Sequence, residues 1–303
     1  MAKPTIANVA ELAGVSQATV SRALRGATNV TEETRIKVQR AADQLNFTLS
    51  KSASALASGK TMRVILLVSG KLNEWFNSGV LQGVYEELAP VGYDVTPAFI
   101  TDRSELDWFF SQLPKSRNAD AIIISSFQLM PAMRDQLQAI DLPTVGVNVP
   151  AESGYFDASI SIDNSSAMTM AVRLLRSLGH TNIAFCSDYI PADMVYNTSQ
   201  RTQAFADAAQ ANATDGITFS LLTADAHDAP LSKADLASQL TAKLLSLPER
   251  PTAVCVETDQ VAIALVKELR KQQLNVPEDI SVLGFDDAEI AQAADLSTIR
   301  QEP

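Results

Sequence analysis

Residues 5–24 read TIANVAELAGVSQATVSRAL, and this stretch predicts two short helices joined by a tight turn. Thr5 stands where an N-cap is expected for the first helix, and Gly14 can adopt the left-handed backbone that ends it. Ser16 then caps the second helix. The alanines between these positions let the two helices approach closely. The pattern is that of a helix-turn-helix unit.

The second helix has a polar outward face near its N-terminus, formed by Gln17, Ala18, Ser21 and Arg22. Gln17 and Arg22 carry fork-shaped groups suited to bidentate contacts with base edges. The hydroxyl groups of Ser16, Thr19 and Ser21 suit contacts with phosphates. The same pattern also fits an ordinary three-helix bundle with a polar face. Pattern alone therefore leaves DNA binding and a plain bundle open.

A third helix is predicted to begin at the N-cap Thr31 and to run to about Asn46, with Ile36, Ala41 and Leu45 facing inward. Residues 47–60, which follow, are small, polar and nearly featureless. A two-turn helix of this composition is marginal in water. By composition, this segment is a flexible linker.

The charge of the chain is unevenly distributed. The whole chain carries a net charge of −11, which argues against a nucleic-acid partner. Residues 1–60, however, hold eight Lys and Arg against four Asp and Glu, a net of +4, so the remainder carries −15. A basic N-terminal part on an acidic body indicates that only the N-terminal part meets a polyanion.

From Met62 onward, apolar strands alternate with amphipathic helices. The expected strands are 63–69, 93–99, 121–125, 144–147, 182–186, 218–222, 253–256 and 281–285, with an extended stretch at 159–162. The expected helices are 78–89, 105–113, 130–140, 165–178, 199–212, 233–247 and 260–271. This alternation predicts an α/β body with parallel sheets covered on both faces. The number of units predicts two sheets, divided near residues 150–160.

Composition excludes several classes of function. Cys186 and Cys255 lie in apolar runs and are interpreted as buried free thiols, because neither a disulfide framework nor a zinc spacing is present. With two histidines, no phosphate loop, no dinucleotide fingerprint and no nucleophile elbow, we expect no metal, no cofactor and no enzyme activity. The N-terminus lacks an apolar signal segment and no run is long enough to span a bilayer, so a cytoplasmic protein without membrane contact is expected.

Several motifs together resemble one protein family. They include residues 5–10, 13–16, 19–22 and 30–35 in the N-terminal part, and residues 173–180, 251–254 and 279–287 (DISVLGFDD) in the body. Their order and density resemble the lactose/galactose repressor (LacI/GalR) family over essentially the whole chain. The resemblance implies a helix-turn-helix domain and a two-lobed, Rossmann-like body of the type I periplasmic-binding-protein fold, with a ligand cleft between the lobes.

The resemblance also sets expected domain limits. The helix-turn-helix domain covers 1–46, a hinge helix or linker covers 47–60, and the effector-binding domain covers 61–303. Within that domain, lobe one covers about 61–158 and lobe two about 159–295. Similar proteins continue beyond Pro303, so the C-terminal end is expected to be short.

The resemblance implies a set of DNA contacts. Base contacts fall to Gln17, Ala18 and Arg22, and backbone contacts to Ser16, Thr19 and Ser21. Thr5 and Asn29 complete the expected set of DNA-binding residues in the helix-turn-helix domain, called the head below. In similar proteins the hinge helix pairs with that of a second subunit and inserts a leucine into the minor groove, roles that match Ala53 and Leu56. The chain departs from the family at Leu49, where a proline is usual, and at Ser54, where an arginine is common.

The implied effector contacts lie in the body. They are Trp75, Phe76, Asn148, Asp163, Arg201, Thr258, Asp259 and Asp286. Asn148, Asp259 and Asp286 follow predicted strands, and open α/β sheets bind ligands beyond the carboxyl ends of their strands. A sugar site needs carboxylates, a guanidinium and an aromatic platform.

Four of these residues also allow a purely structural interpretation. Asp163 and Asp286 can be helix caps, Arg201 a surface residue, and Trp75 a core or interface residue. Glu74 replaces a proline that is usual in the family before the aromatic pair, which changes the expected loop.

The sequence therefore predicts a homodimeric transcriptional repressor that binds palindromic operator DNA. A small effector, expected to be a sugar, controls its affinity for the operator. The alternative is a solute-binding protein of a transport system, which shares the body fold but would need a signal peptide and no DNA-binding head. A sugar-acting enzyme is a weaker alternative because no catalytic set is visible.

Overall fold

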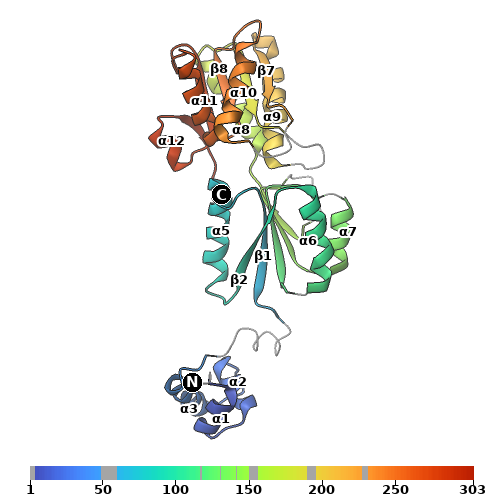
Figure 1. Cartoon of the computed structure of the whole chain (residues 1–303), viewed down its shortest axis with the longest axis vertical. Coiled ribbons are helices and arrows are strands. Elements are labelled where there is room, and N and C mark those ends of the chain that lie inside the picture. Colours follow the sequence, from blue (N-terminus) through green and yellow to red (C-terminus); the bar gives the residue numbers. More distant parts are fainter. Residues whose placement is uncertain are drawn as a thin grey trace.

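The computed structural model describes residues 4–48, 60–116, 118–129, 131–140, 142–149, 156–189, 196–226 and 231–303. Figure 1 shows an N-terminal cluster of helices followed by two α/β lobes. The expected hinge residues Ala53 and Leu56, with Leu49 and Ser54, lie outside the described residues.

The N-terminal cluster contains α1 (Ile6–Ala13), α2 (Gln17–Leu24) and α3 (Glu32–Gln44). The predicted caps are confirmed, since Thr5, Ser16 and Thr31 each accept a hydrogen bond from a backbone N–H in the first turn of their helix. Gly14 has a φ of 61° and ends α1 in the left-handed conformation.

The core of this cluster differs from the prediction at one position. Val9, Ala13, Val20 and Val38 are buried at its centre. The prediction that Ile36 faces inward is wrong, because its side chain is 45% exposed. Val38, two positions further along α3, points to the opposite side of the helix and fills the core instead.

The first lobe is a parallel sheet with helices on both faces. Its elements are β1 (Arg63–Ser69), α5 (Trp75–Leu88), β2 (Asp94–Ile100), α6 (Arg103–Ser116), β3 (Ala121–Ser125), α7 (Pro131–Ile140), β4 (Thr144–Val147) and β5 (Ala158–Ile160), and the strand order is β2-β1-β3-β4-β5. Alternate β1 residues face opposite sides: Leu66 packs against α5, and Leu67 belongs to the core under α6 and α7. Figure 1 shows α5 on one side of the sheet and α6 and α7 on the other.

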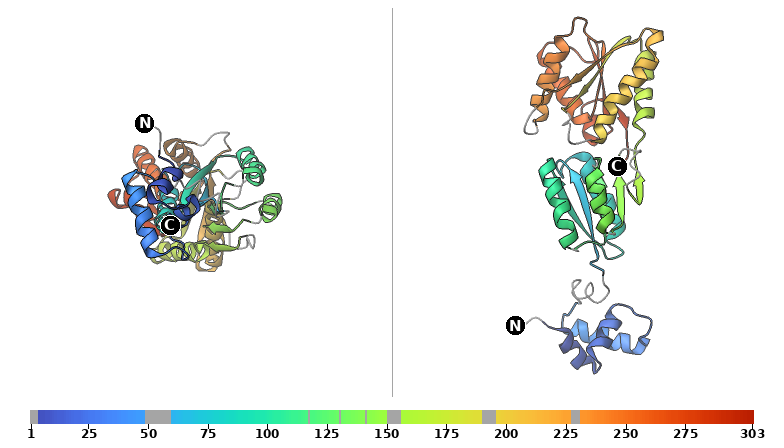
Figure 2. Two further views of the ribbon diagram at one scale, coloured as in Figure 1. Left: turned by 90° about the horizontal axis from the view of Figure 1, so that it is seen from below. Right: turned by 90° about the vertical axis from the view of Figure 1, so that its right-hand side faces the viewer.

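The second lobe repeats this architecture. Its elements are α8 (Asn164–Ser177), β6 (Asn182–Ser187), α9 (Asn197–Ala211), η1 (Ala213–Asp215), β7 (Thr218–Thr223), α10 (Lys233–Leu245), β8 (Ala253–Val256), α11 (Asp259–Lys271), β9 (Ser281–Asp286), α12 (Glu289–Ala293) and β10 (Ser297–Arg300). All strand pairs are parallel, in the order β10-β9-β8-β6-β7. One face is covered by α8 and α9 and the other by α10 and α11, and Figure 2 shows this layering from further sides.

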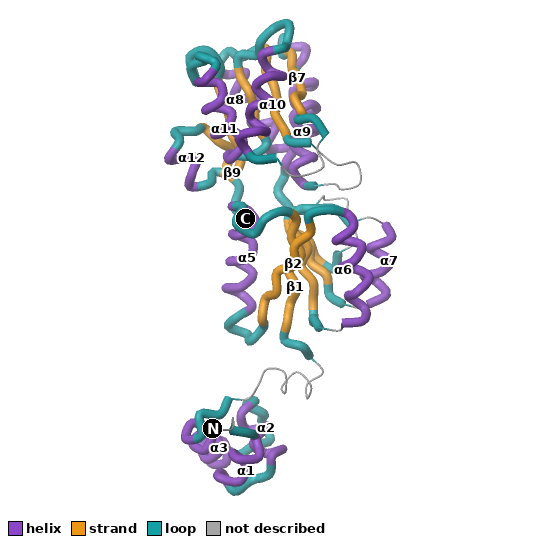
Figure 3. Tube along the Cα trace, viewed as in Figure 1, coloured by secondary structure: helices purple, strands orange, loops and turns teal. Residues whose placement is uncertain are grey.

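Strand pairing shows which sheet each end of the body joins. Strand β5 pairs with β4 in the first sheet, so residues through Ile160 belong to the first lobe. Strand β10 pairs with β9, so the second lobe extends past 295. Figure 3 shows the two sheets as separate blocks of strands. The lobes touch where Phe127 and Tyr196 form an antiparallel bridge.

Three further features bear on function class. Cys186 and Cys255 are free and buried, as predicted. No helix in the described ranges is long and apolar enough to cross a membrane. No cluster of His, Cys, Asp or Glu positioned to hold a metal ion occurs among the residues that the structure describes.

Candidate functional site

The exposed face of α2 presents the predicted DNA-reading residues, with Gln17 and Ala18 in its first turn and Arg22 in its last. Gln17, Ala18 and Arg22 are exposed, whereas Val20 and Ala23 on the opposite side of the helix are buried. The Nε–H of Arg22 donates to the carbonyl oxygen of Ala18 at 3.2 Å, which holds the base of this side chain along the helix. Its guanidinium remains on the outer surface of the head.

The hydroxyl-bearing residues around this face have partners of their own. Ser16 is exposed and accepts from the backbone N–H of Thr19 at 3.1 Å, as the N-cap of α2. Thr5 is exposed and donates to Oδ1 of Asn8 at 2.7 Å. Ser21 is half-buried, and Asn29 is exposed in the turn before α3. Of these four residues, Thr5, Ser16 and Asn29 are exposed and Ser21 is half-buried.

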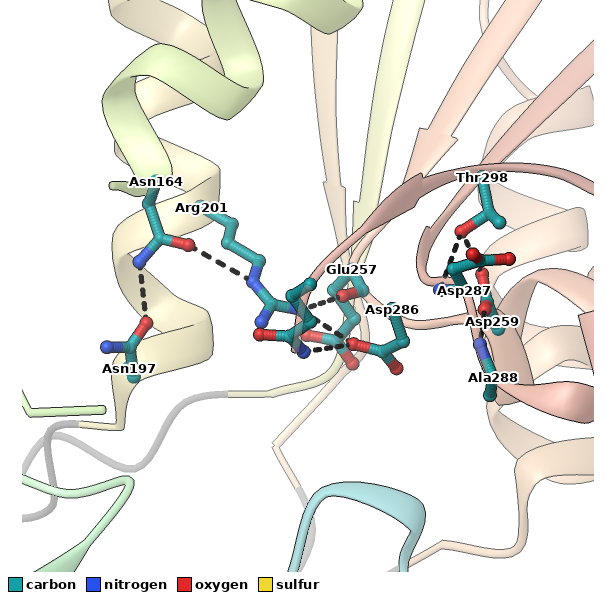
Figure 4. A network of polar contacts seen from close by, with 10 residues as sticks. Asn164, Asn197, Arg201, Glu257, Asp259, Asp286, Asp287, Ala288 and Thr298 are labelled. Carbon is teal, nitrogen blue, oxygen red and sulfur yellow. Dashed lines mark hydrogen bonds and ion pairs between the residues drawn. The ribbon is translucent and has the colours of Figure 1, made fainter. Parts of the chain in front are cut away.

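In the body, the centre of the candidate site is the buried side chain of Arg201. It is 2% exposed and projects from α9 toward the carboxyl end of the second sheet. Its Nε–H donates to Oδ1 of Asn164 at 3.3 Å, and Nη1 donates to the backbone oxygen of Glu257. Nη1 also lies 3.7 Å from Oδ1 of Asp286, as Figure 4 shows. The guanidinium carbon lies 3.7 Å from the ring centroid of Phe285. Arg201 is therefore held in one orientation by three elements.

Asp286 is the last residue of β9 and is 7% exposed. Nε2 of Gln301 donates to its Oδ1 at 2.5 Å. Burial raises the pKa of Asp286 to about 7, while the Arg201 guanidinium acts to lower it. Asp286 has a φ of 129°, in the region that side chains rarely adopt, so the backbone holds an uncommon conformation at this contact.

Asp259 and Thr258 lie at the carboxyl end of β8. Asp259 is fully buried and accepts from the Thr298 hydroxyl at 2.6 Å and from the backbone N–H of Ala288 at 2.9 Å. Its carboxylate thereby fastens the loop after β9 to β10, and burial raises its pKa. Thr258 precedes α11 without capping it, and its buried Oγ1 has no hydrogen-bond partner.

Asn148 joins the first lobe to this network. It follows β4, is 6% exposed and has a φ of 52°. Its backbone oxygen accepts from Nδ2 of Asn197 at 2.9 Å, and Oδ1 of Asn197 accepts from Nδ2 of Asn164 at 2.6 Å. The buried polar chain thus runs from the end of β4 through two asparagines to Arg201. Such a chain is suited to transmit a change between the lobes.

The remaining predicted effector residues lie outside this network. Asp163 is exposed and caps α8, accepting from the backbone N–H and the hydroxyl of Ser166 at 2.9 and 2.6 Å. Trp75 and Phe76 occupy the first turn of α5, with ring centroids 6.4 Å apart, and Phe76 packs against the first-lobe core. One turn further along, Gly79 lies against Pro303, which follows the second lobe. The pair therefore lies at the end of the first lobe that meets the second.

Sequence reasoning missed four residues of this network: Asn164, Asn197, Glu257 and Gln301. Glu257 follows the apolar strand β8 directly, so the strand-end rule applied to Asn148 would have found it. Gln301 follows β10, a strand that was not predicted. No sequence signal marks Asn164 and Asn197 apart from their place at helix starts.

Comparison with known proteins fits this architecture. The family model described as "Bacterial regulatory proteins, lacI family" matches residues 5–50, and "Periplasmic binding protein-like domain" matches residues 172–303. The "HTH-type transcriptional repressor PurR" of Vibrio vulnificus (strain CMCP6) is 32% identical over 302 residues, covering 98% of this chain and 86% of that protein. The chain belongs to the LacI family.

Other LacI-family proteins extend the comparison. "Catabolite control protein A" of Priestia megaterium is 26% identical over 288 residues, covering 95% of this chain and 83% of that protein. The solved structure of the Lac repressor dimer bound to operator and the anti-inducer ONPF is 24% identical, with a TM-score of 0.82, covering 99% of this chain and 88% of that chain. The CelR–cellobiose complex is 26% identical, with a TM-score of 0.64, at the same coverage.

Family membership fixes the function class of both parts. The α1–α3 head is a LacI-type DNA-binding domain, and the two lobes form a periplasmic-binding-protein-like effector domain. The chain is a DNA-binding transcriptional repressor of this family with a ligand-binding body. Its relatives are repressors and regulators rather than enzymes.

Proposed function

We propose that this chain acts as a homodimer that represses transcription by binding a palindromic operator, and that a small polyhydroxylated ligand between the lobes changes its operator affinity. Two identical heads related by a two-fold axis require two related half-sites, so the dimer and the palindrome imply each other. The ligand acts only through different affinities for the two states of the protein.

One observation carries the ligand part of this proposal. The buried pair of Arg201 and Asp286 lies at the carboxyl end of the second sheet and is linked through Asn164 and Asn197 to Asn148 in the first lobe. Ligands of open α/β folds bind at this edge. A ligand that contacts the pair would also act on the network joining the lobes. Among the structural neighbours, CelR is seen with cellobiose, which supports a sugar as the ligand class.

The DNA part rests on the exposed face of α2. Gln17, Ala18 and Arg22 are proposed to meet base edges, and Ser16, Thr19 and Ser21 to meet phosphates. Thr5 and Asn29 are proposed as further DNA contacts from the head. Ala53 and Leu56 keep their proposed hinge role, Leu56 as the minor-groove wedge. If Leu56→Ala left operator affinity and DNA bending unchanged, the wedge role would be wrong.

The same proposal places Trp75, Phe76, Thr258, Asp259 and Asp163 in or near the effector site. Asp163 already caps α8, and Asp259 already holds the loop after β9 through its hydrogen bond with Thr298. For these two residues, a contact with the ligand would be an additional role. We also propose that the chain binds its ligand without converting it and works in the cytoplasm, where its DNA target lies. The match of the head to a DNA-binding family argues against a solute-binding protein of a transport system.

The test is operator selection from random DNA, followed by fluorescence anisotropy on the selected site with the chain of 303 residues. We expect a palindromic site, and a loss of about 5- to 100-fold in affinity for Gln17→Ala. Gln39→Ala, an exposed glutamine on α3, is the matched control and should bind normally. Equal affinity for selected and unrelated DNA would overturn the proposal. Light scattering of the free protein tests the dimer.

A further inference from the structure

The carboxyl end of the second sheet holds more negative charge than its cation compensates. Glu257, Asp259 and Asp286 are 7%, 0% and 7% exposed, and Arg201 is the buried cation among them. Within the described part of the chain, the one ion pair that any of these three carboxyls makes is the 3.7 Å contact of Asp286 with Arg201. A buried charge is costly unless it is paired and fully hydrogen-bonded.

The three carboxyls differ in the hydrogen bonds that they accept from the protein. Asp259 accepts from Thr298 and Ala288 and serves to hold the loop after β9. Glu257 accepts one hydrogen bond, from the backbone N–H of Asp188 at 3.0 Å, while Arg201 bonds to its backbone oxygen rather than to its carboxylate. The positive charge of Arg201 therefore acts on two buried acids, Asp286 at the end of β9 and Glu257 just after β8, and Lys233 also faces Glu257.

Gln301 adds an unpaired acceptor at the same place. Its side chain is 8% exposed, and Nε2 donates to Asp286 at 2.5 Å. Because the carboxylate needs a donor, this contact fixes the amide orientation and turns Oε1 away from it. Oε1 is buried and has no hydrogen-bond partner. The Oδ1 atom of Asn148, at the first-lobe end of the network, is likewise buried and unpaired.

Both features call for the same missing group. The buried Gln301 Oε1 lacks a hydrogen-bond donor, and the Asp286 carboxylate beside this amide has, among the described residues, a single ion pair, the 3.7 Å contact with Arg201. Sugar hydroxyls can donate hydrogen bonds but bring no charge. A protonated amine brings one positive charge and up to three donors, with no acceptor that would compete.

We propose that the effector of this repressor carries a protonated primary amine, which binds against the Asp286 carboxylate and Gln301 Oε1, while Glu257 acts on this site through the Arg201 guanidinium that lies near both acids. The ligand class is an amine-bearing sugar or polyol rather than a neutral sugar. This inference rests on the proposed ligand-controlled function and specifies the chemistry of its ligand.

The proposal predicts a pH dependence. Burial raises the pKa of both Glu257 and Asp286 to about 7, so both are partly protonated near neutrality in the free protein. The charged groups facing them are Asp188 after β6, Arg201 on α9, Lys233 at the start of α10 and Asp259 on α11. The amine favours the ionised carboxyls, so affinity should rise about tenfold from pH 6 to pH 8 as a group with a pKa near 7 ionises.

The experiment uses the chain of 303 residues and matched pairs of probes. These are 6-amino-6-deoxy-D-glucose with D-glucose, 6-amino-6-deoxy-D-galactose with D-galactose, and 1-amino-1-deoxy-sorbitol with sorbitol. Alkyl amines, like that of lysine, stay largely protonated over this pH range. Thermal shift and calorimetry should show that an amine probe raises the melting temperature and binds at least tenfold more tightly than its neutral partner. Equal binding within every pair, or no shift with any amine probe, would overturn the inference.

Variants separate this inference from the underlying function. Glu257→Gln keeps the acceptor for the Asp188 N–H, and it should weaken amine binding and flatten its pH dependence. Asp286→Asn should abolish the preference for the amine. Asp207→Asn, which removes an exposed carboxylate from α9, is the charge-matched control and should change neither. Operator binding without ligand, measured on each variant, reports whether the protein is folded and whether the repressor function itself holds.

Discussion

At the scale of the residue, Arg201 shows how a charged side chain becomes tolerable inside a protein. It is 2% exposed, and burial lowers the pKa of its guanidinium. Asn164, the Glu257 backbone, the Asp286 carboxylate and the Phe285 ring surround it. Removing the cation of a buried ion pair lowers the free energy of unfolding by more than the pair itself contributes, because the buried carboxylate is then left without a counter-charge.

Arg201→Met is therefore expected to destabilise the body by about 3–5 kcal/mol at pH 8. The loss should shrink as pH falls toward 6, because Asp286 and Glu257 then become protonated and no longer need a cation. Urea unfolding at both pH values measures this. Arg173→Met, at an exposed position on α8, should cost little at either pH. A penalty that did not depend on pH would show that lost packing, rather than charge, dominates.

Glu257 predicts a second pH effect, in the absence of ligand. Burial raises its pKa from an ordinary value near 4.5 to about 7, so between these pH values the folded protein binds more protons than the unfolded chain. Stability from this group is therefore present below about pH 4.5 and is lost as pH rises to 7.

Glu257→Gln should match the parent protein at pH 5 and exceed it by at least about 1 kcal/mol at pH 8. Thermal unfolding at pH 5, 6, 7 and 8 tests this, with the exposed Glu278→Gln as the matched control. A constant difference between variant and parent over this range would mean that Glu257 is ionised throughout.

At the scale of the element, strands and helices were largely predictable because their apolar periodicity is strong. Strands 121–125, 144–147 and 253–256 are observed with the predicted bounds. The periodicity fails where elements are short or exposed, as for α12 and β10, whose burial patterns give little contrast. Missing β10 also hid Gln301, since a residue cannot be placed at a strand end before the strand is recognised.

The start of α5 shows a second limit. A helix was predicted from about residue 78, but α5 begins at Trp75 with Glu74 at the N-cap position. Trp75 and Phe76 thus lie in the first turn of a helix rather than in the preceding loop. The side chain of Glu74 makes no hydrogen bond with the first turn of α5, so no capping motif marks where this helix begins. The sequence grouped Arg201 with Asp259 and Asp286, but it did not show that Asp259 holds the loop after β9 while Asp286 contacts Arg201, because these contacts join segments distant in the chain.

Asp163 allows the helix cap and the ligand contact to be separated. Asp163→Ala removes the acceptor for Ser166 and should lower the melting temperature by about 2–4 °C. Asp163→Ser retains a good N-cap and should restore the melting temperature. If the serine variant keeps both its stability and its ligand response, Asp163 is a cap alone. A stable serine variant with a lost response would instead place its carboxylate in the effector site.

At the scale of the whole molecule, Asn197 makes two polar contacts that join the lobes. Its backbone N–H donates to Ser126 at 3.0 Å, and its side chain donates to Asn148 at 2.9 Å. Ser126 and Asn148 both have a positive φ, which places them in the left-handed region at the ends of β3 and β4. Because Asn197 also contacts Asn164, and Asn164 contacts Arg201, a ligand at Arg201 is two side chains away from the first lobe.

Asn197→Ala should therefore weaken the coupling between ligand and operator more than it weakens either binding step. Coupling is the ratio of operator dissociation constants with and without the probe that most stabilises the protein. We expect this ratio to fall toward one, while operator affinity without ligand changes by less than about twofold, a fraction of a kcal/mol. Asn212→Ala removes a comparable side-chain contact, to Ala208 at 2.7 Å, at the other end of α9, and it should leave the ratio intact. Anisotropy titrations of both variants measure this ratio. If the ratio for Asn197→Ala were undiminished, the coupling between ligand and operator would have to pass through other contacts between the lobes, such as that of Pro303 with Gly79.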